Sequence, residues 1–468
     1  MRRRHLLTLL LTATSLPLTA QITYKVTPFD EGGRNVVSAD FNRDGRPDLA
    51  YPNTGISVKL NTGDGSFGNT LSTPAADDND SAFLLALDVN GDQWPDLLRL
   101  SETADIFLSN HDGTFTQGQS LNFPSYASSA RAGDLNGDGK VDVVLFNKTR
   151  LQVFLGDGAG GFVPGQVLTF AETPAASYAP PFELADINGD GKLDLVFVEP
   201  AKLVIWPGTG TGHFGQPSFI ADPTGDPANH GLLQFVISDF NNDGYPDLLL
   251  SARNFVSCND GHNCGVAENF IYRNDGHGNF TRIHSFQAGP DAALVTAADL
   301  NGDGNIDLLF SEDNPDHPIN YYVLGAGNGT FGAQTQAESA TQTMVRDLNL
   351  DGRNDLVLSN SWGGNMQVLI ATNGYVNCPP PGSANLAAKI CVPATASAAS
   401  PLLVRASGNS PLGLKRIEIW IDGKKAAQKL DSQIGKRFTL SPGTHRIAVV
   451  AVDQYLGTAT TVKNVTIQ

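Results

Sequence analysis

A nine-residue pattern, Asp-x-Asn-x-Asp-Gly-x-x-Asp followed by an apolar run, recurs seven times in this chain of 468 residues. The copies begin at Asp40, Asp88, Asp134, Asp186, Asp239, Asp299 and Asp347. Internal repeats of about 50 residues indicate a propeller, a solenoid or another array, so this pattern constrains the fold more than any other feature.

The flanks of the pattern repeat as well. Each copy lies between short apolar segments, and each unit ends in a Gly-rich turn and an aromatic residue, such as Gly-Asp-Gly-Ser-Phe in the first. Four short strands per unit, with almost no helical periodicity, predict an all-β fold. We expect a seven-bladed β-propeller, with a solenoid as the alternative. The seventh unit lacks a fourth strand, and residues 22–29 can supply it, which favours a closed ring.

The motif concentrates oxygen ligands. Three carboxylates and an amide within nine residues are costly together unless a cation lies among them, and all-oxygen ligands suit calcium. We number the motif positions 1 to 9: side chains at 1, 3, 5 and 9 and the backbone carbonyl at 7 are the candidate ligands, and Gly at 6 permits a sharp turn. The sequence predicts up to seven Ca²⁺ sites, formed by Asp40, Asn42, Asp44, Arg46, Asp48, Asp88, Asn90, Asp92, Trp94, Asp96, Asp134, Asn136, Asp138, Lys140, Asp142, Asp186, Asn188, Asp190, Lys192, Asp194, Asp239, Asn241, Asp243, Tyr245, Asp247, Asp299, Asn301, Asp303, Asn305, Asp307, Asp347, Asn349, Asp351, Arg353 and Asp355.

Other interpretations of the motif are weaker. An EF-hand needs Glu at position 12, where the first repeat has Tyr51, and it needs helical flanks. Turns of Asp, Asn and Gly that bind nothing do not readily explain three aspartates at fixed positions in all seven copies. The second motif has Gln93 at position 6, so we expect its site to bind the cation most weakly.

These repeats resemble the FG-GAP/VCBS family, the units of integrin α-subunit propellers and of many exported bacterial proteins. Phe67-Gly68, Phe214-Gly215 and Phe331-Gly332 keep the Phe-Gly pair, and the resemblance covers residues 21–376. It implies calcium cages in the loops between the first two strands of each blade. It does not imply an integrin's function.

The ends of the chain differ from the repeats. Residues 1–20, with Arg2 to Arg4 and a short apolar run, predict a secretory signal peptide, and we expect a secreted protein with no membrane span after cleavage. Residues 377–391 are predicted to be a Pro-rich linker, tied back by a disulfide. Residues 392–468 alternate as strands and resemble a bacterial immunoglobulin-like β-sandwich.

The four cysteines suit an oxidising compartment. They form two pairs that are local in sequence, Cys258 with Cys264 and Cys378 with Cys391, and we expect two disulfides. The first pair lies in the insertion that makes the fifth repeat the longest.

Charge and motifs limit the function. A formal net charge of −17 argues against nucleic acid or anionic lipid as partner. We expect a non-catalytic scaffold, monomeric, that binds an extracellular protein or polysaccharide in adhesion. The alternative is a polysaccharide lyase or hydrolase built on the propeller. No nucleophile elbow, zincin or P-loop motif is present, and a lone His230 or His262 in a loop is more often a solvated residue than a catalyst.

Overall fold

The computed structural model is all β. It describes residues 24–29, 35–77, 79, 82–124, 126–147, 149–170, 182–199, 202–224, 230–257, 263–290, 292–312, 320–337, 342–359, 366–372, 378, 381, 385–392, 395–396, 402–410, 413–429, 433–453 and 457–468. Within these residues there is no helix, and therefore none that is long and apolar enough to cross a membrane. The predicted signal peptide lies outside them.

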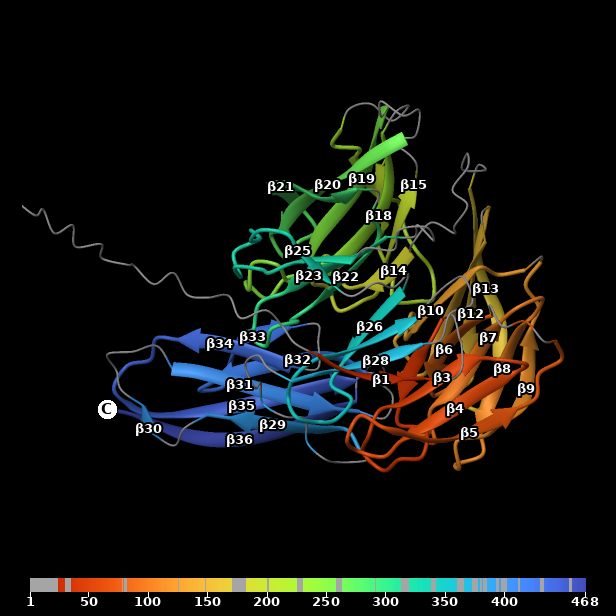
Figure 1. Cartoon of the computed structure of the whole chain (residues 1–468), viewed down its shortest axis with the longest axis horizontal. Coiled ribbons are helices and arrows are strands. Elements are labelled where there is room, and N and C mark those ends of the chain that lie inside the picture. Colours follow the sequence, from red (N-terminus) through yellow and green to blue (C-terminus); the bar gives the residue numbers. More distant parts are fainter. Residues whose placement is uncertain are drawn as a thin grey trace, which may run out of the picture.

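Seven four-stranded antiparallel sheets form the blades of a propeller (Figure 1), and we number each blade by its motif. Blade 1 contains β2 (Val37–Ala39), β3 (Asp48–Pro52), β4 (Ile56–Asn61) and β5 (Phe67–Thr73). Blade 2 contains β6 (Phe83–Leu87), β7 (Asp96–Leu100), β8 (Ala104–Ser109) and β9 (Phe115–Leu121). Blade 3 contains β10 (Ser129–Gly133), β11 (Asp142–Asn147), β12 (Arg150–Gly156) and β13 (Phe162–Thr169).

The next three blades repeat this order. Blade 4 contains β14 (Phe182–Ala185), β15 (Asp194–Glu199), β16 (Lys202–Trp206) and β17 (Ser218–Ala221). Blade 5 contains β18 (His230–Ser238), β19 (Asp247–Ser257), β20 (Asn263–Asn274) and β21 (Phe280–Pro290). Blade 6 contains β22 (Ala292–Ala298), β23 (Asp307–Glu312), β24 (Asn320–Val323) and β25 (Thr335–Ala337).

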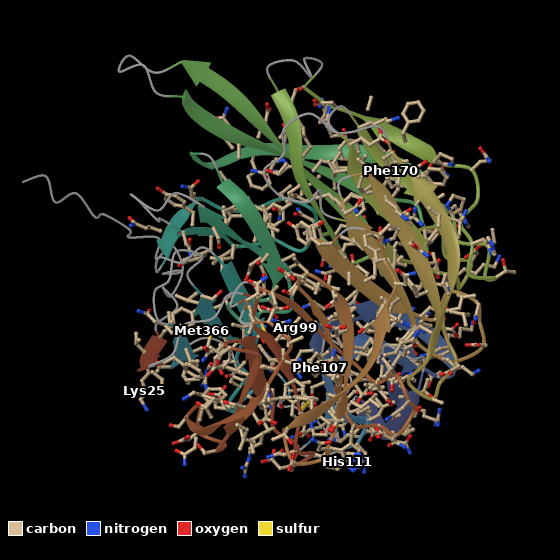
Figure 2. All side chains as sticks on the ribbon, turned by 90° about the vertical axis from the view of Figure 1, so that its right-hand side faces the viewer. Lys25, Arg99, Phe107, His111, Phe170 and Met366 are labelled. Atoms are coloured by element: carbon tan, nitrogen blue, oxygen red, sulfur yellow. A yellow bond between two sulfur atoms is a disulfide. The ribbon has the colours of Figure 1, made fainter. Side chains whose placement is uncertain are left out.

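Blade 7 closes the ring with strands from both ends of the repeat region. β26 (Gln342–Arg346), β27 (Asp355–Ser359) and β28 (Gln367–Ala371) are completed by β1 (Tyr24–Pro28), which pairs with β28 from Tyr24↔Ala371 to Pro28↔Gln367. Lys25 of β1 and Met366, just before β28, lie on the same side of the ring (Figure 2). This confirms that the N-terminal segment supplies the missing strand.

The core of the ring is divided into seven apolar clusters, one between each pair of neighbouring blades. Position 2 of each motif is buried in the cluster shared with the next blade, and in blades 1 to 5 and 7 that cluster also contains the aromatic residue that ends the following unit. Phe41 and Phe115 pack edge to face with ring centroids 5.7 Å apart, and Phe240 and Phe331 do so at 6.0 Å. The repeated aromatic residue therefore locks each unit to the one before it.

The fifth repeat extends its blade. β19 and β20 pair as far as Ser257↔Asn263, so the inserted residues lengthen a hairpin. The predicted bond between Cys258 and Cys264 lies outside the described residues and side chains.

The C-terminal region is a two-sheet sandwich around one apolar cluster. One sheet has β29 (Ala387–Cys391), β31 (Leu402–Asn409) and β34 (Gln433–Phe438); the other has β30 (Thr395–Ala396), β32 (Leu414–Ile421), β33 (Lys424–Lys429), β35 (Gly443–Asp453) and β36 (Thr458–Ile467). β29 lies inside the segment predicted as linker, so the sandwich begins earlier than the pattern indicated. Cys378 and Cys391 form the expected disulfide.

Candidate metal centre

All seven motifs lie at one end of the ring. Each connects the first strand of its blade to the second; for example, Asp40 to Asp48 joins β2 to β3. The hairpin turns between third and fourth strands lie at this same end, because successive strands are antiparallel. We call it the loop end, and its position agrees with what the resemblance implied.

Position 6 has a left-handed backbone in every loop. The φ angles are 87° at Gly45, 69° at Gln93, 79° at Gly139, 85° at Gly191, 93° at both Gly244 and Gly304, and 89° at Gly352. A residue other than Gly is strained in the left-handed region of backbone conformation. Gln93 therefore makes the blade 2 loop costlier to form, which is the strain expected from the sequence.

The carboxylate at position 1 organises the turn. In blade 1 the backbone N–H groups of Asp44 and Gly45 donate to Asp40 at 3.0 and 2.8 Å. Position 5 accepts in turn from the N–H of position 7, as Asp44 does from Arg46 at 3.0 Å. The bond from position 6 to position 1 recurs in all seven loops, at 2.8 to 3.0 Å.

The carboxylate at position 9 is the most buried group of the site. Asp48 is 0% exposed, and it accepts from the N–H of Phe41 at 2.8 Å and from the N–H of Asn61 at 2.7 Å. The same two bonds, one from position 2 and one from the end of the third strand or two residues beyond it, occur at Asp96, Asp142, Asp194, Asp247, Asp307 and Asp355. The aspartates at positions 1, 5 and 9 therefore accept backbone hydrogen bonds that shape the loop, a role that does not require a cation.

The charge on these carboxylates is not neutralised by the protein. Burial, together with the nearby motif carboxylates, raises the pKa of Asp48, Asp96 and Asp247 to about 7. Burial also raises the pKa of Asp142, Asp194 and Asp355 to about 6. Within the part of the chain that the structure describes, none of the seven position 9 carboxylates forms an ion pair.

Position 1 shows the same electrostatic cost. Burial raises the pKa of Asp40 and Asp239 to about 6 and that of Asp347 to about 7. Two carboxylates with raised pKa values in one loop are the environment that a bound divalent cation relieves.

The side chain at position 7, where it is Arg or Lys, pairs with the carboxylate at position 5: Arg353 lies 2.9 Å from Asp351, and Arg46 lies 3.4 Å from Asp44. The same side chain covers a glycine of the neighbouring hairpin turn: a Cβ on Gly63 would lie 3.0 Å from Arg46, and one on Gly158 would lie 3.0 Å from Lys140. The position 7 residues were predicted to contribute only a backbone carbonyl, but in blades 1, 3, 4 and 7 their side chains also partner the position 5 carboxylate.

Blade 2 departs from this arrangement. His111 takes the place of the hairpin glycine and stacks on Trp94 at 4.5 Å between ring centroids, with Nε2 3.2 Å from Asp92 Oδ2. His111 lies at the rim of the blade, while Arg99 and Phe107 lie in its interior (Figure 2). The second loop is thus unusual both in its position 6 residue and in its neighbour.

The donor set fits a hard cation. Each loop offers only oxygen ligands, and a carboxylate has about four acceptor positions, so the N–H bonds leave lone pairs for a metal. As the side chains stand, no three Asp, Glu, His or Cys residues among those described converge closely enough to hold an ion. Binding would therefore require carboxylates at positions 1, 5 and 9 to turn towards a common centre.

Two buried asparagines at the loop end escaped the sequence analysis. Asn61 donates from Nδ2 to the carbonyls of Pro47 and Leu348, and Asn274 does so to those of Pro246 and Ile187. Each therefore joins its own loop to the loop of the preceding blade. Their signal in the sequence is an Asn at the end of the third apolar segment, just before the Gly-rich turn.

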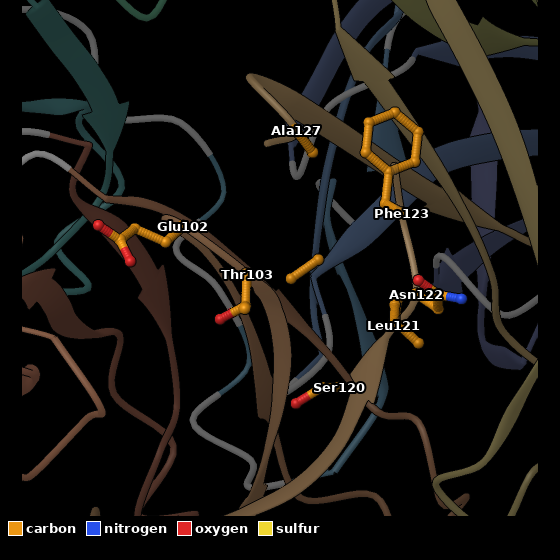
Figure 3. A pocket seen from close by; sticks show the side chains of 8 residues that line it. Glu102, Thr103, Ser120, Leu121, Asn122, Phe123 and Ala127 are labelled. Carbon is orange, nitrogen blue, oxygen red and sulfur yellow. The ribbon is translucent and has the colours of Figure 1, made fainter. Parts of the chain in front are cut away.

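A pocket of about 260 Å³ opens at the other end of the ring (Figure 3). It lies between the turn joining β7 to β8 and the connection from β9 to β10, and Glu102, Thr103, Ser120, Asn122 and Phe123 line it. The hydroxyls of Thr103 and Ser120 donate to the buried carboxylate of Asp105 at 2.6 and 2.5 Å. Tyr126, in the same connection, is 65% exposed.

Comparison with protein families identifies FG-GAP-like repeats in residues 40–99, 88–145, 134–197, 186–250 and 253–310. The first four matches overlap from one blade into the next, and the five together cover more than half of the chain. No curated protein matches the sequence.

Solved structures of similar shape have low sequence identity. Core factor of S. cerevisiae is 10% identical with a TM-score of 0.51, and the match covers 75% of this chain and 61% of that one. This likeness concerns the fold alone. A lectin of Agrocybe aegerita that recognises non-reducing terminal N-acetylglucosamine is 18% identical with a TM-score of 0.49, covering 75% of this chain and 86% of that one.

Proposed function

Because the chain belongs to the FG-GAP-like repeat family, we propose that it is an exported, calcium-stabilised scaffold that binds a protein or polysaccharide outside the cell. The predicted signal peptide and the disulfide Cys378–Cys391 support the export. The scaffold is a rigid ring of seven blades that presents its connections at two ends.

One observation carries the role of calcium. Seven buried position 9 carboxylates lie beside a second motif carboxylate, and none of them has an ion pair among the described residues. Burying a charge without a counter-charge is costly, and a divalent cation in each loop would remove that cost. Calcium suits the site better than zinc because every candidate ligand is oxygen.

The metal role in this proposal is structural. The seven loops belong to seven different blades, and each lies beside a separate apolar cluster, so they stiffen neighbouring blades rather than form one reaction centre. The partner would then bind elsewhere, and the pocket beside Phe123 and Tyr126 is a candidate contact at the end opposite the loops.

Calorimetry with and without calcium tests the proposal. At a free calcium concentration 100 times its Kd, each occupied site adds about 2.7 kcal/mol to the stability of the folded ring. The ring's melting temperature should fall sharply in EDTA and return when CaCl2 is added. Identical melting curves in EDTA and in calcium would refute a role for the metal.

A second experiment addresses the partner. Arrays of glycans and of extracellular matrix proteins, probed in calcium and in EDTA, should reveal a ligand that is retained in calcium. Release of unsaturated, ultraviolet-absorbing products from a polysaccharide would instead show an enzyme.

A further inference from the structure

The sandwich lies against the loop end of the ring. Gln428 of β33 donates from Nε2 to the carbonyl of Gly244 at 2.6 Å, and Lys436 of β34 donates from Nζ to the carbonyl of Asn242. These carbonyls belong to positions 6 and 4 of the blade 5 motif, which are not candidate ligands. The sandwich can therefore hold this loop without occupying its cation site.

The blade 6 loop meets the sandwich backbone to backbone. A Cβ on Gly304, at motif position 6, would lie only 2.7 Å from the carbonyl oxygen of Gly435 in β34. Such a close approach is possible because neither residue has a side chain. On blade 1, Arg43 donates from Nη2 to Oδ1 of Asn385, just before β29, at 2.5 Å.

Two lysines of the sandwich face the motif carboxylates. Burial lowers the pKa of Lys415, at the start of β32, while the charges of Asp186 and Asp134 on blades 4 and 3 oppose that shift. Lys436 stands near Asp239 of blade 5, whose carboxylate feels its positive charge. Lys436 thus both contacts the blade 5 loop and acts electrostatically on its position 1 carboxylate, while Lys415 interacts electrostatically with the motifs of blades 3 and 4.

The overall charges of the two regions are complementary. Residues 21–376 contain 17 Lys and Arg against 44 Asp and Glu, a net charge of −27. Residues 392–468 contain 10 against 4, a net charge of +6. A basic domain is therefore attached to an acidic ring and lies on the end where the acidic motifs gather.

We propose that the loop end is the docking surface of this chain's own sandwich, and that sandwich docking and cation binding in blades 3 to 5 oppose each other. The second part rests on the proposed calcium binding. Lys415 and Lys436 partly neutralise carboxylates that a cation would neutralise fully, so a bound cation repels them. By linkage, undocking the sandwich must raise calcium affinity by the same factor by which calcium weakens docking.

Charge removal on the full-length protein tests the coupling. The Lys415→Met/Lys436→Met protein, stripped with EDTA and titrated with CaCl2 in a calorimeter, should bind calcium about fivefold more tightly at the affected sites, near the lower limit of typical coupling between sites. Lys424→Met is the matched control, because Lys424 is exposed in β33. Equal affinities for wild type, control and double variant would overturn the coupling.

A wedge tests the docking independently of any charge. A Cβ on Gly435 would lie 3.8 Å from Gly304 Cα, so Gly435→Ala fits, whereas the larger side chain of Gly435→Leu would push the two surfaces apart. In small-angle X-ray scattering, Gly435→Leu should increase the radius of gyration, and Gly435→Ala should not. An unchanged radius in a Gly435→Leu protein that retains the sandwich's own melting transition would overturn the docking surface.

The two experiments separate the possible failures. If wild type binds no calcium, the proposed function fails and the coupling fails with it, while scattering still decides the docking surface. If wild type binds calcium and Gly435→Leu undocks without a gain in affinity, only the coupling is wrong.

Discussion

The ring and the sandwich hold themselves together in different ways. The sandwich has one apolar cluster enclosed by two sheets, whereas the ring has seven, each shared by two blades. The ring also buries a carboxylate beside every cluster, while the sandwich pairs its buried Glu418 with Arg416 and Lys425. A domain built of equal units thus depends on every interface and on counter-charges that it does not itself supply.

The largest effect on this difference is expected where β1 closes the ring. Phe29 is buried beside Tyr51 and Phe67, at 6.2 and 5.4 Å between ring centroids, and follows the strand that completes blade 7. Phe29→Ala should destabilise the ring by about 3–5 kcal/mol and leave the sandwich unchanged. Urea unfolding followed for each domain measures this, with Val26→Ala on the exposed face of β1 as control. Equal losses in both domains would show that they do not unfold separately.

The next test removes a buried carboxylate. Asp142→Ala deprives the N–H groups of Leu135 and Gly156 of their acceptor, so the ring should lose about 2–4 kcal/mol even in EDTA. Asp138→Ala, at the exposed position 5, should cost much less in EDTA but should still weaken calcium binding. Equal effects of the two variants in EDTA would contradict the structural role of position 9.

The pH dependence should differ between the two regions. The raised pKa values of the ring, about 6 at Asp142 and about 7 at Asp48, mean that the folded ring binds more protons than the unfolded chain above pH 4. In EDTA the ring should therefore be more stable near pH 5 and lose that stability as the pH rises through 6 to 7. In the sandwich, burial raises the pKa of Glu418, but hydrogen bonds from Arg416 and Trp420 and nearby positive charge lower it overall, so the stability that Glu418 contributes is lost as the pH falls through that lowered pKa. Thermal melts from pH 5 to 8 test this, and a ring that strengthens with rising pH in EDTA would refute it.

The smallest effect is expected within the ring, at its unusual second loop. Gln93→Gly relieves a left-handed residue and should stabilise blade 2 by roughly 1 kcal/mol, tightening its calcium site by several-fold. The same reasoning makes blade 2 the weakest site, so Asp88→Ala should cost less calcium affinity than Asp134→Ala. Calorimetric titration of the four proteins, wild type included, checks both statements.

Local pattern predicted what local geometry determines. The repeat period predicted seven blades, and the absence of a fourth strand in the seventh unit predicted that β1 closes the ring. The glycine at position 6 predicted a sharp turn, which the structure shows to be left-handed. The hydrogen-bond partners of the position 9 carboxylates could not be predicted from the motif, because Asp48 accepts from the N–H of Asn61 at the end of another strand. The contact of Lys436 with Asn242 joins residues of two domains, and no periodicity in the sequence encodes such a contact.

The pairing of β1 with β28 also imposes a waiting time on folding. Tyr24 is made first and its partner Ala371 last, so at 5–20 residues per second the closing strand waits for roughly 20–70 s during synthesis. Until then β1 and the flank of blade 1 are open to pairing with other chains. Once the ring is closed it has no terminal blade from which to unravel, so its persistence is governed by the rate of opening one interface rather than by the stability of any single blade.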